Sequence, residues 1–252
     1  MRILLTNDDG VSAPGLLALV PGLSARGRVV VIAPRAEQSG IGHAITYRSP
    51  IAVEVARVDG CAEAYAVDGT PADCVKFALL EGLPQRPDLV VSGINLGLNL
   101  GYNIFYSGTV AAAIEGAMYS VPSVAFSTCH GNADKLPRVA EQALRVLDLL
   151  LERGSDAALA YNVNVPTLCD GEPDVAFTHH RDSAFRERYV RRQRGAELVY
   201  QLNLSAGEQE TAGGQCDEHV VGRGMISITP LRASLTDHDS LERLFRERPP
   251  RV

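Results

Sequence analysis

The stretch Arg2-Ile3-Leu4-Leu5-Thr6-Asn7-Asp8-Asp9-Gly10 opens the chain with an apolar run that leads directly into two carboxylates. The run predicts a buried β-strand over residues 2–6. Open α/β sheets hold ligands beyond the carboxyl ends of their strands, and Asp8 and Asp9 fall at such an end. Neighbouring carboxylates repel each other unless a cation or a proton offsets their charge, so the stretch predicts a metal site, with a solvated turn as the alternative.

Short β-rich runs alternate with helical stretches beyond this point, which is typical of a parallel sheet covered on both faces. The sequence therefore predicts an α/β fold, a Rossmann-like three-layer sandwich with a mainly parallel sheet plus a C-terminal β-hairpin or arm extension. We expect one domain over 1–252, with a core of about 1–166 and 225–235 and an excursion of hairpins and loops over about 167–224. The predicted strands are 2–6, 29–33, 51–55, 65–67, 89–91, 123–126, 159–165 and 225–231, and the predicted helices are 14–26, 71–82, 110–119, 136–153 and 238–248.

The composition narrows the class of protein. With 252 residues, of which 46% are hydrophobic and 21% charged, the chain can bury one large core. A net charge of -6 argues against binding to a phosphate backbone through bulk positive charge, so we expect no nucleic-acid partner. No membrane span or signal peptide is evident, and five cysteines without a C-x-x-C pair predict neither disulfides nor a zinc ribbon. We therefore expect a cytoplasmic protein with no membrane partner.

Further polar segments fall where predicted strands end. Residues 34–40 follow the second strand and residues 92–101 follow the strand at 89–91, so in a parallel sheet both loops share an edge with Asp8 and Asp9. Ser107-Gly108-Thr109 precedes a helix, where backbone N–H groups, the helix dipole and two hydroxyls favour an anion. An ordinary N-cap is the alternative interpretation of that motif.

Taken together, these motifs resemble the stationary-phase survival protein SurE family of metal-dependent nucleotidases. The matching segments occur in family order and are 6–10, Ala33-Pro34 with Gln38-Ser39-Gly40, His43, 68–75, 87–95, 99–101, 106–110, 162–166 and 228–231. The resemblance implies hydrolysis of nucleoside monophosphates, and homodimers or homotetramers with exchanged C-terminal elements. It also implies a divalent metal held by Asp8, Asp9, Ser39 and Asn95. Two departures from the family pattern, Ser234-Leu235-Thr236 and Cys216-Asp217, concern the C-terminal packing.

The chemistry of the implied ligands indicates the metal. An all-oxygen set suits Mg²⁺ or Mn²⁺ better than Zn²⁺, and we expect one ion per subunit. Four protein contacts leave coordination positions for water and for the phosphate of a nucleoside 5′-monophosphate. Nucleoside 3′-monophosphates and short polyphosphate are further candidate substrates. The ion would neutralise charge on the phosphate and activate or position a water for in-line attack.

Other residues are candidates for holding the substrate. Ser107, Gly108 and Thr109 would bind the remaining phosphate oxygens, with Asn99 as a helper. Asp8 and Asp9 are the candidate catalytic carboxylates, and His43 is a candidate proton donor to the leaving oxygen, with a purely structural loop histidine as the alternative. His130, His179, His180 and His219 have no motif around them and are expected at the surface.

One other mechanism and two other functions compete with hydrolysis by direct attack of water. Asp8 or Asp9 could form an aspartyl-phosphate, although the two-aspartate spacing of haloacid dehalogenases is missing here. The same pocket could serve a non-catalytic nucleotide or metal sensor. A dinucleotide-dependent dehydrogenase is disfavoured because residues 7–15 lack the G-x-G-x-x-G pattern.

Overall fold

A sheet of nine strands lies at the centre of the computed structural model, which describes residues 1–61, 63–154, 160–169, 171–182, 187–195, 197–204 and 214–246. The strands lie in the order β3-β4-β2-β1-β5-β6-β7-β11-β8. Strand β3 is antiparallel to β4 and β11 is antiparallel to β7, while the other neighbours run parallel. The bounds are β1 (Arg2–Thr6), β2 (Arg28–Pro34), β3 (Val53–Val55), β4 (Glu63–Val67), β5 (Leu89–Leu96), β6 (Ser123–Thr128), β7 (Ala160–Val165), β8 (Val175–Phe177) and β11 (Ile226–Leu231).

Helices cover both faces of this sheet. Successive residues of β1 alternate between the faces, so Ile3 and Leu5 pack with α1 (Pro14–Ser24) and α4 (Leu136–Arg153). Leu4 packs on the opposite face, in a second cluster that includes residues of α2 (Pro71–Phe77) and α3 (Gly108–Met118). The predicted three-layer α/β sandwich with a mainly parallel sheet is confirmed.

Helix α1 approaches β5 very closely at Gly15. A Cβ atom built on Gly15 would lie 2.0 Å from the carbonyl oxygen of Ile94. Because that oxygen belongs to the backbone of a central strand, neither element can move aside cheaply.

We therefore expect Gly15→Ala to lower the free energy of unfolding by about 3 kcal/mol, as overpacked cores do. Urea unfolding monitored by circular dichroism would measure the change, with Leu17→Ala as a control on the same helix, where the Leu17 side chain is exposed. A midpoint equal to that of wild type would contradict this close packing.

Some element bounds differ from those predicted. Strand β5 continues to Leu96 rather than ending at residue 91, because its pairing with β6 resumes at Asn95 after an irregularity beyond Ser92. Helix α3 begins at Gly108 because Ser107 caps it, accepting a hydrogen bond from the backbone N–H of Val110 at 3.1 Å. The predicted start of β7 at residue 159 lies outside the described residues.

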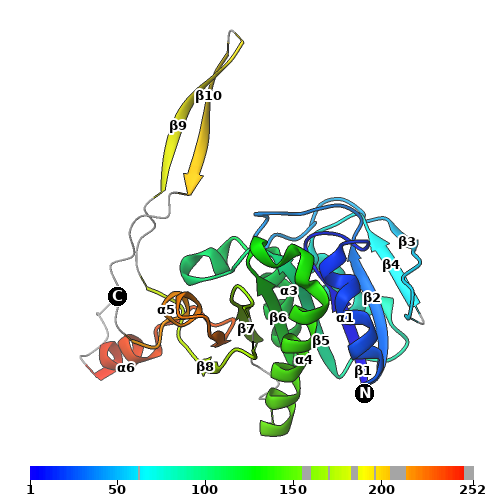
Figure 1. The fold of residues 1–252 in the computed structure, drawn as a ribbon. Coiled ribbons are helices and arrows are strands. Elements are labelled where there is room, and N and C mark those ends of the chain that lie inside the picture. The colour runs from blue at the N-terminus through cyan, green and yellow to red at the C-terminus, as the bar shows by residue number, and fades with distance from the viewer. Residues whose placement is uncertain are drawn as a thin grey trace.

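The predicted excursion holds more structure than hairpins and loops. Strands β9 (Glu187–Arg194) and β10 (Glu197–Leu204) form an antiparallel hairpin that projects far from the sheet, which confirms the predicted arm (Figure 1). The excursion also contains β8, which joins the sheet edge beside β11, and the helix α5 (Asp217–Gly222). The sequence analysis missed both because a three-residue strand and a six-residue helix are too short to show a periodicity.

The last described element is α6 (His238–Arg246), where a helix over 238–248 was predicted; residues 247 and 248 lie outside the described residues. None of the described helices is both long and apolar enough to cross a membrane. All five cysteines lie within the described ranges and are free thiols.

Candidate functional site

The candidate site lies where the strand order reverses. Strand β1 has β2 on one side and β5 on the other, and in open α/β sheets ligands bind beyond the carboxyl ends of the strands at such a reversal. Asp8 and Asp9 follow β1, Ser39 follows β2, and Asn95 lies near the end of β5.

Asp8 is buried against the beginning of α3. The Thr109 hydroxyl donates a short hydrogen bond to Asp8 Oδ1, and the Thr109 backbone also bonds this carboxylate. A Cβ atom on Gly108 would lie 2.9 Å from Asp8 Cβ, so only glycine allows so close an approach. Burial raises the pKa of Asp8, and the hydrogen bonds from Thr109 partly offset that effect.

Asp9 lies toward the end of β5, whereas Asp8 lies toward α3. The pKa of Asp9 is raised to about 6, first by burial and then by the negative charges of Asp8 and Glu37. A hydrogen bond from the backbone of Leu96 and the nearby His130 act in the opposite direction. The two carboxylates therefore share a region where added positive charge would be stabilising.

Ser39 lies on the loop after β2, and Asn95 lies near the end of β5, at the same edge of the sheet. The backbone N–H of Gln38 donates to the carbonyl oxygen of Asp8 at 2.7 Å, which fixes the loop carrying Ser39 beside β1. The Ser39 hydroxyl donates to Glu37 Oε1 at 2.5 Å. Asn95 uses Nδ2 to donate to the carbonyl oxygen of Gly97 at 2.7 Å, so Oδ1 is the acceptor end of this amide.

This donor set fits a hard divalent cation. Among the described residues, no group of three or more His, Cys, Asp or Glu side chains could hold a metal ion. A cation between Asp8 and Asp9 would therefore need neutral oxygens as well, and Ser39 and Asn95 offer a hydroxyl and an amide oxygen. Two carboxylates with raised pKa values and two neutral oxygens suit Mg²⁺ or Mn²⁺.

The four candidate phosphate-binding residues separate into two places. Ser107, Gly108 and Thr109 lie together at the start of α3, but the Thr109 hydroxyl is directed to Asp8. Asn99 is also buried, and its Nδ2 donates to the hydroxyl of Ser127 at 2.8 Å. Its carbonyl oxygen accepts hydrogen bonds from the Asn162 and Asn164 amides. These hydrogen bonds therefore tie the loop after β5, which carries Asn99, to strands β6 and β7.

His43 is paired with a carboxylate on α3. Its Nε2 lies 2.8 Å from Oε2 of Glu115, and Glu115 follows Gly108 by seven residues on α3. The neighbouring Gly42 N–H donates to the carbonyl oxygen of Tyr106 at 2.9 Å, so His43 lies near the beginning of α3 and uses Nε2 to contact Glu115. Its role as a proton donor stays a prediction.

Sequence reasoning missed Glu37 and His130 as neighbours of the site. Glu37 precedes Ser39 by two residues, so its position in the candidate loop was a signal. His130 is exposed as expected, yet it lies beside the loop after β5, with Nε2 3.7 Å from a Cβ built on Gly97. Its position just after β6, at the same sheet edge, could have revealed this proximity.

The sequence of this chain matches the model of a known protein family. The family model described as "Survival protein SurE" matches residues 3–187, a range that includes all the site residues above. The chain belongs to the SurE family. The resemblance inferred from the motifs is thus confirmed.

SurE relatives match nearly the whole chain. A 5'-nucleotidase SurE of Rhodopirellula baltica is 41% identical over 246 residues, covering 97% of this chain and 97% of the relative. A 5'-nucleotidase SurE 1 of Thermus thermophilus is 42% identical over 249 residues, covering 97% and 96%. The crystal structure of the SurE protein from Aquifex aeolicus superposes with a TM-score of 0.82 at 34% identity, covering 98% of this chain and 100% of that chain. The likeness therefore extends beyond the site to the excursion and the C-terminal strand.

Proposed function

We propose that this chain is a divalent-metal-dependent phosphomonoesterase that hydrolyses nucleoside 5′-monophosphates to nucleoside and phosphate. The observation that carries this function is the pairing of Asp8 and Asp9 at the switch point of the sheet, directly against the start of α3. The 5′-nucleotidase names of relatives that match nearly the whole chain support the reaction and its substrate class. Nucleoside 3′-monophosphates and short polyphosphate are further candidate substrates.

In this proposal Asp8, Asp9, Ser39 and Asn95 hold one Mg²⁺ or Mn²⁺ per subunit. Such an ion, when bound, neutralises charge on the phosphate and lowers the pKa of a coordinated water. Asp8 and Asp9 fix its position, since Thr109 orients the first carboxylate and the Leu96 backbone bonds the second.

The start of α3 supplies the phosphate-binding groups. The Ser107 oxygen accepts from Val110, so its O–H can be directed to a phosphate oxygen. The backbone N–H of Gly108 and the dipole of this 11-residue helix favour the same anion. Thr109 contributes by holding Asp8 next to the bound phosphate, and Asn99 keeps the adjoining loop rigid.

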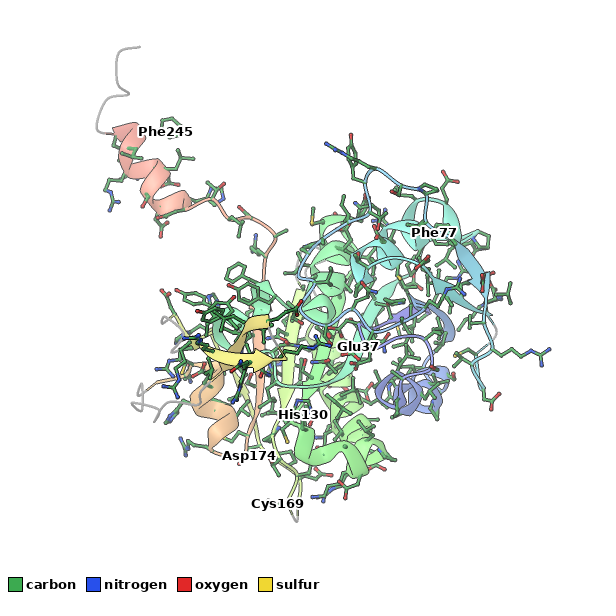
Figure 2. All side chains as sticks on the ribbon, turned by 90° about the horizontal axis from the view of Figure 1, so that it is seen from above. Glu37, Phe77, His130, Cys169, Asp174 and Phe245 are labelled. Carbon is green, nitrogen blue, oxygen red and sulfur yellow. The ribbon has the colours of Figure 1, made fainter. Side chains whose placement is uncertain are left out.

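We also propose a homodimer or homotetramer with exchanged C-terminal elements. Leu244 and Phe245 on α6 are 60% and 68% exposed, which is unusual for such apolar side chains. Phe245 projects away from the part of the molecule that carries Glu37 and His130 (Figure 2). Size-exclusion chromatography with light scattering would test this, and a monomer at micromolar concentration would refute it.

The proposed metal site predicts a particular dependence on pH. The pKa of Asp9 in the metal-free protein is about 6, so this carboxyl is protonated below pH 6 and must lose its proton to bind an ion. We expect the apparent Mn²⁺ affinity to be level above pH 7 and to fall by about tenfold per pH unit below 6. The metal-free protein should show the opposite trend and lose stability as the pH rises from 4 to 6, because the raised pKa makes the folded state bind more protons there.

Isothermal titration with MnCl₂ between pH 5 and pH 8, together with thermal melts of the metal-free protein, would measure both trends. Asp9→Asn is the matched variant for the melts, and in it the loss of stability between pH 4 and pH 6 should largely disappear. An affinity that does not change between pH 5 and pH 7 would contradict the assignment of Asp9.

Phosphate release from a panel of 5′- and 3′-nucleoside monophosphates, with MnCl₂ or MgCl₂, tests the function directly. Binding of nucleotide and metal without turnover would favour the sensor over the enzyme. Rapid quench with labelled substrate would separate the two mechanisms of hydrolysis, because an acid-stable, hydroxylamine-sensitive phosphoenzyme would establish an aspartyl-phosphate and refute direct attack by water.

A further inference from the structure

Glu115 is a buried carboxylate outside the candidate metal site. Its side chain is only 2% exposed, and each of its oxygens has one partner: Oε2 lies 2.8 Å from His43 Nε2, and Oε1 lies 2.5 Å from Lys76 Nζ. Burial raises the pKa of Glu115, but the hydrogen bonds from His43 and Lys76 outweigh it and leave the pKa below its usual value. The carboxylate is therefore charged, and a buried charge of this kind depends on its partners.

One partner of Glu115, Lys76, lies on a helix, and the other, His43, lies in an irregular segment. Lys76 lies on α2 and also donates to the hydroxyl of Tyr119 at 3.1 Å, at the end of α3. Its Nζ lies 5.0 Å from the centre of the Tyr119 ring. This side of the cluster joins two packed helices, and the packing of α3 on β5 and β6 gives Glu115 a rigid position from which to hold His43.

His43 lies in an irregular segment, residues 38–46, which we term the Ser39 segment. It contains no helix or strand, so no regular ladder of hydrogen bonds fixes it. It is held instead by contacts at separate points, and Ser39 lies between the first two. These contacts include Gln38 N–H to the Asp8 carbonyl at 2.7 Å, Gly42 N–H to the Tyr106 carbonyl at 2.9 Å, His43 to Glu115, the Thr70 hydroxyl to the Ala44 carbonyl at 2.7 Å, and Thr46 N–H to Asp73 Oδ1 at 2.9 Å.

We propose that Glu115 is a positioning residue for the metal site, acting through His43 to hold the Ser39 segment beside Asp8 and Asp9. This inference rests on the proposed function. It gives His43 the role of an anchor and not of a proton donor, which agrees with the engagement of His43 Nε2 by Glu115. A ligand loop that is held in advance loses less conformational freedom when the ion binds, so the contact should appear in metal affinity.

The test compares His43→Ala with His43→Gln. A glutamine amide can donate to Glu115 from nearly the position of Nε2, but it cannot donate a proton to a leaving group. Binding of Mn²⁺ is measured without substrate by electron paramagnetic resonance of the free ion. Cleavage by trypsin at the exposed Arg48, just beyond the Ser39 segment, measures the loosening of the segment independently of any metal.

We expect His43→Ala to weaken Mn²⁺ binding about tenfold and to be cleaved at Arg48 several times faster, with kcat at saturating Mn²⁺ falling less than about threefold. His43→Gln should recover most of the lost affinity. Equal kcat losses of 100-fold or more in both variants would instead establish a proton donor and overturn the proposal. Wild-type Mn²⁺ affinity and cleavage rate in His43→Ala would overturn it as well.

Lys76→Met is the matched control, because it removes the other partner of Glu115 without touching the Ser39 segment. It should change the melting temperature but leave Mn²⁺ affinity within about twofold of wild type. An effect on Mn²⁺ affinity as large as that of His43→Ala would show that the cluster acts only through the packing of α2 and α3, which would overturn the positioning role. A wild-type protein that binds no Mn²⁺ would refute the proposed function, whereas faster cleavage of His43→Ala would then still establish the hold on the segment.

Discussion

Asp8→Asn should abolish measurable Mn²⁺ binding and lower kcat/KM by roughly 1,000-fold, while making the metal-free protein more stable. The asparagine keeps the shape of the side chain and can still accept from Thr109, but it removes one of the two carboxylates that face the proposed ion. Burial raises the pKa of Asp8, which means that its charged form is unfavourable in the metal-free protein. Removing that charge next to Asp9 should therefore raise the melting temperature by about 2–4 °C at pH 8.

Thermal melts with and without MnCl₂ would measure both effects in one experiment. Wild type should gain stability from Mn²⁺, and Asp8→Asn should not. Asp88→Asn is the matched control, because Asp88 is exposed at the opposite edge of the sheet, where it accepts from the backbone N–H of Arg2. An Asp8→Asn protein that is less stable without metal, yet still stabilised by Mn²⁺, would show that this carboxylate is a structural cap and not a ligand.

The sheet could be predicted from the sequence because its strands are strongly patterned. Buried runs such as 29–33 and 123–126 are almost wholly apolar, so their type and position follow from composition and length. The continuation of β5 to Leu96 could not be predicted, since Ser92, Gly93 and Asn95 are typical of a loop. Only pairing with β6 makes this stretch a strand, and pairing between distant segments is not a local property.

The candidate site was predictable in its outline and not in its details. The rule that ligands lie beyond the carboxyl ends of parallel strands brings Asp8, Ser39 and Asn95 to one edge without any coordinates. It says nothing about which hydroxyl turns toward which carboxylate, and Thr109 in fact bonds Asp8. The pairing of His43 with Glu115 was missed because the two residues are 72 positions apart, and nothing in either local pattern indicates the other.

Gly108→Ala should lower kcat/KM by roughly 100-fold although it adds a single methyl group, because small displacements of reacting groups have effects of this size. A Cβ atom at this position would lie 2.9 Å from Asp8 Cβ and 3.0 Å from Pro71 Cγ. A proline ring and the first carbon of a short side chain cannot rotate away, so Asp8 must shift. Mn²⁺ affinity should fall together with activity for the same reason.

The stability of this variant should change much less than its activity. Alanine is favoured over glycine in a helix by about 1 kcal/mol, which offsets part of the steric strain at the start of α3. Gly131→Ala is the control, since the nearest atom to a Cβ there is Cys129 Sγ at 3.8 Å. The comparison requires kcat/KM, Mn²⁺ affinity and urea midpoints for both variants. Full activity in Gly108→Ala would mean that Asp8 and α3 are not in contact during turnover, and it would contradict the binding of the phosphate at the start of α3 next to Asp8.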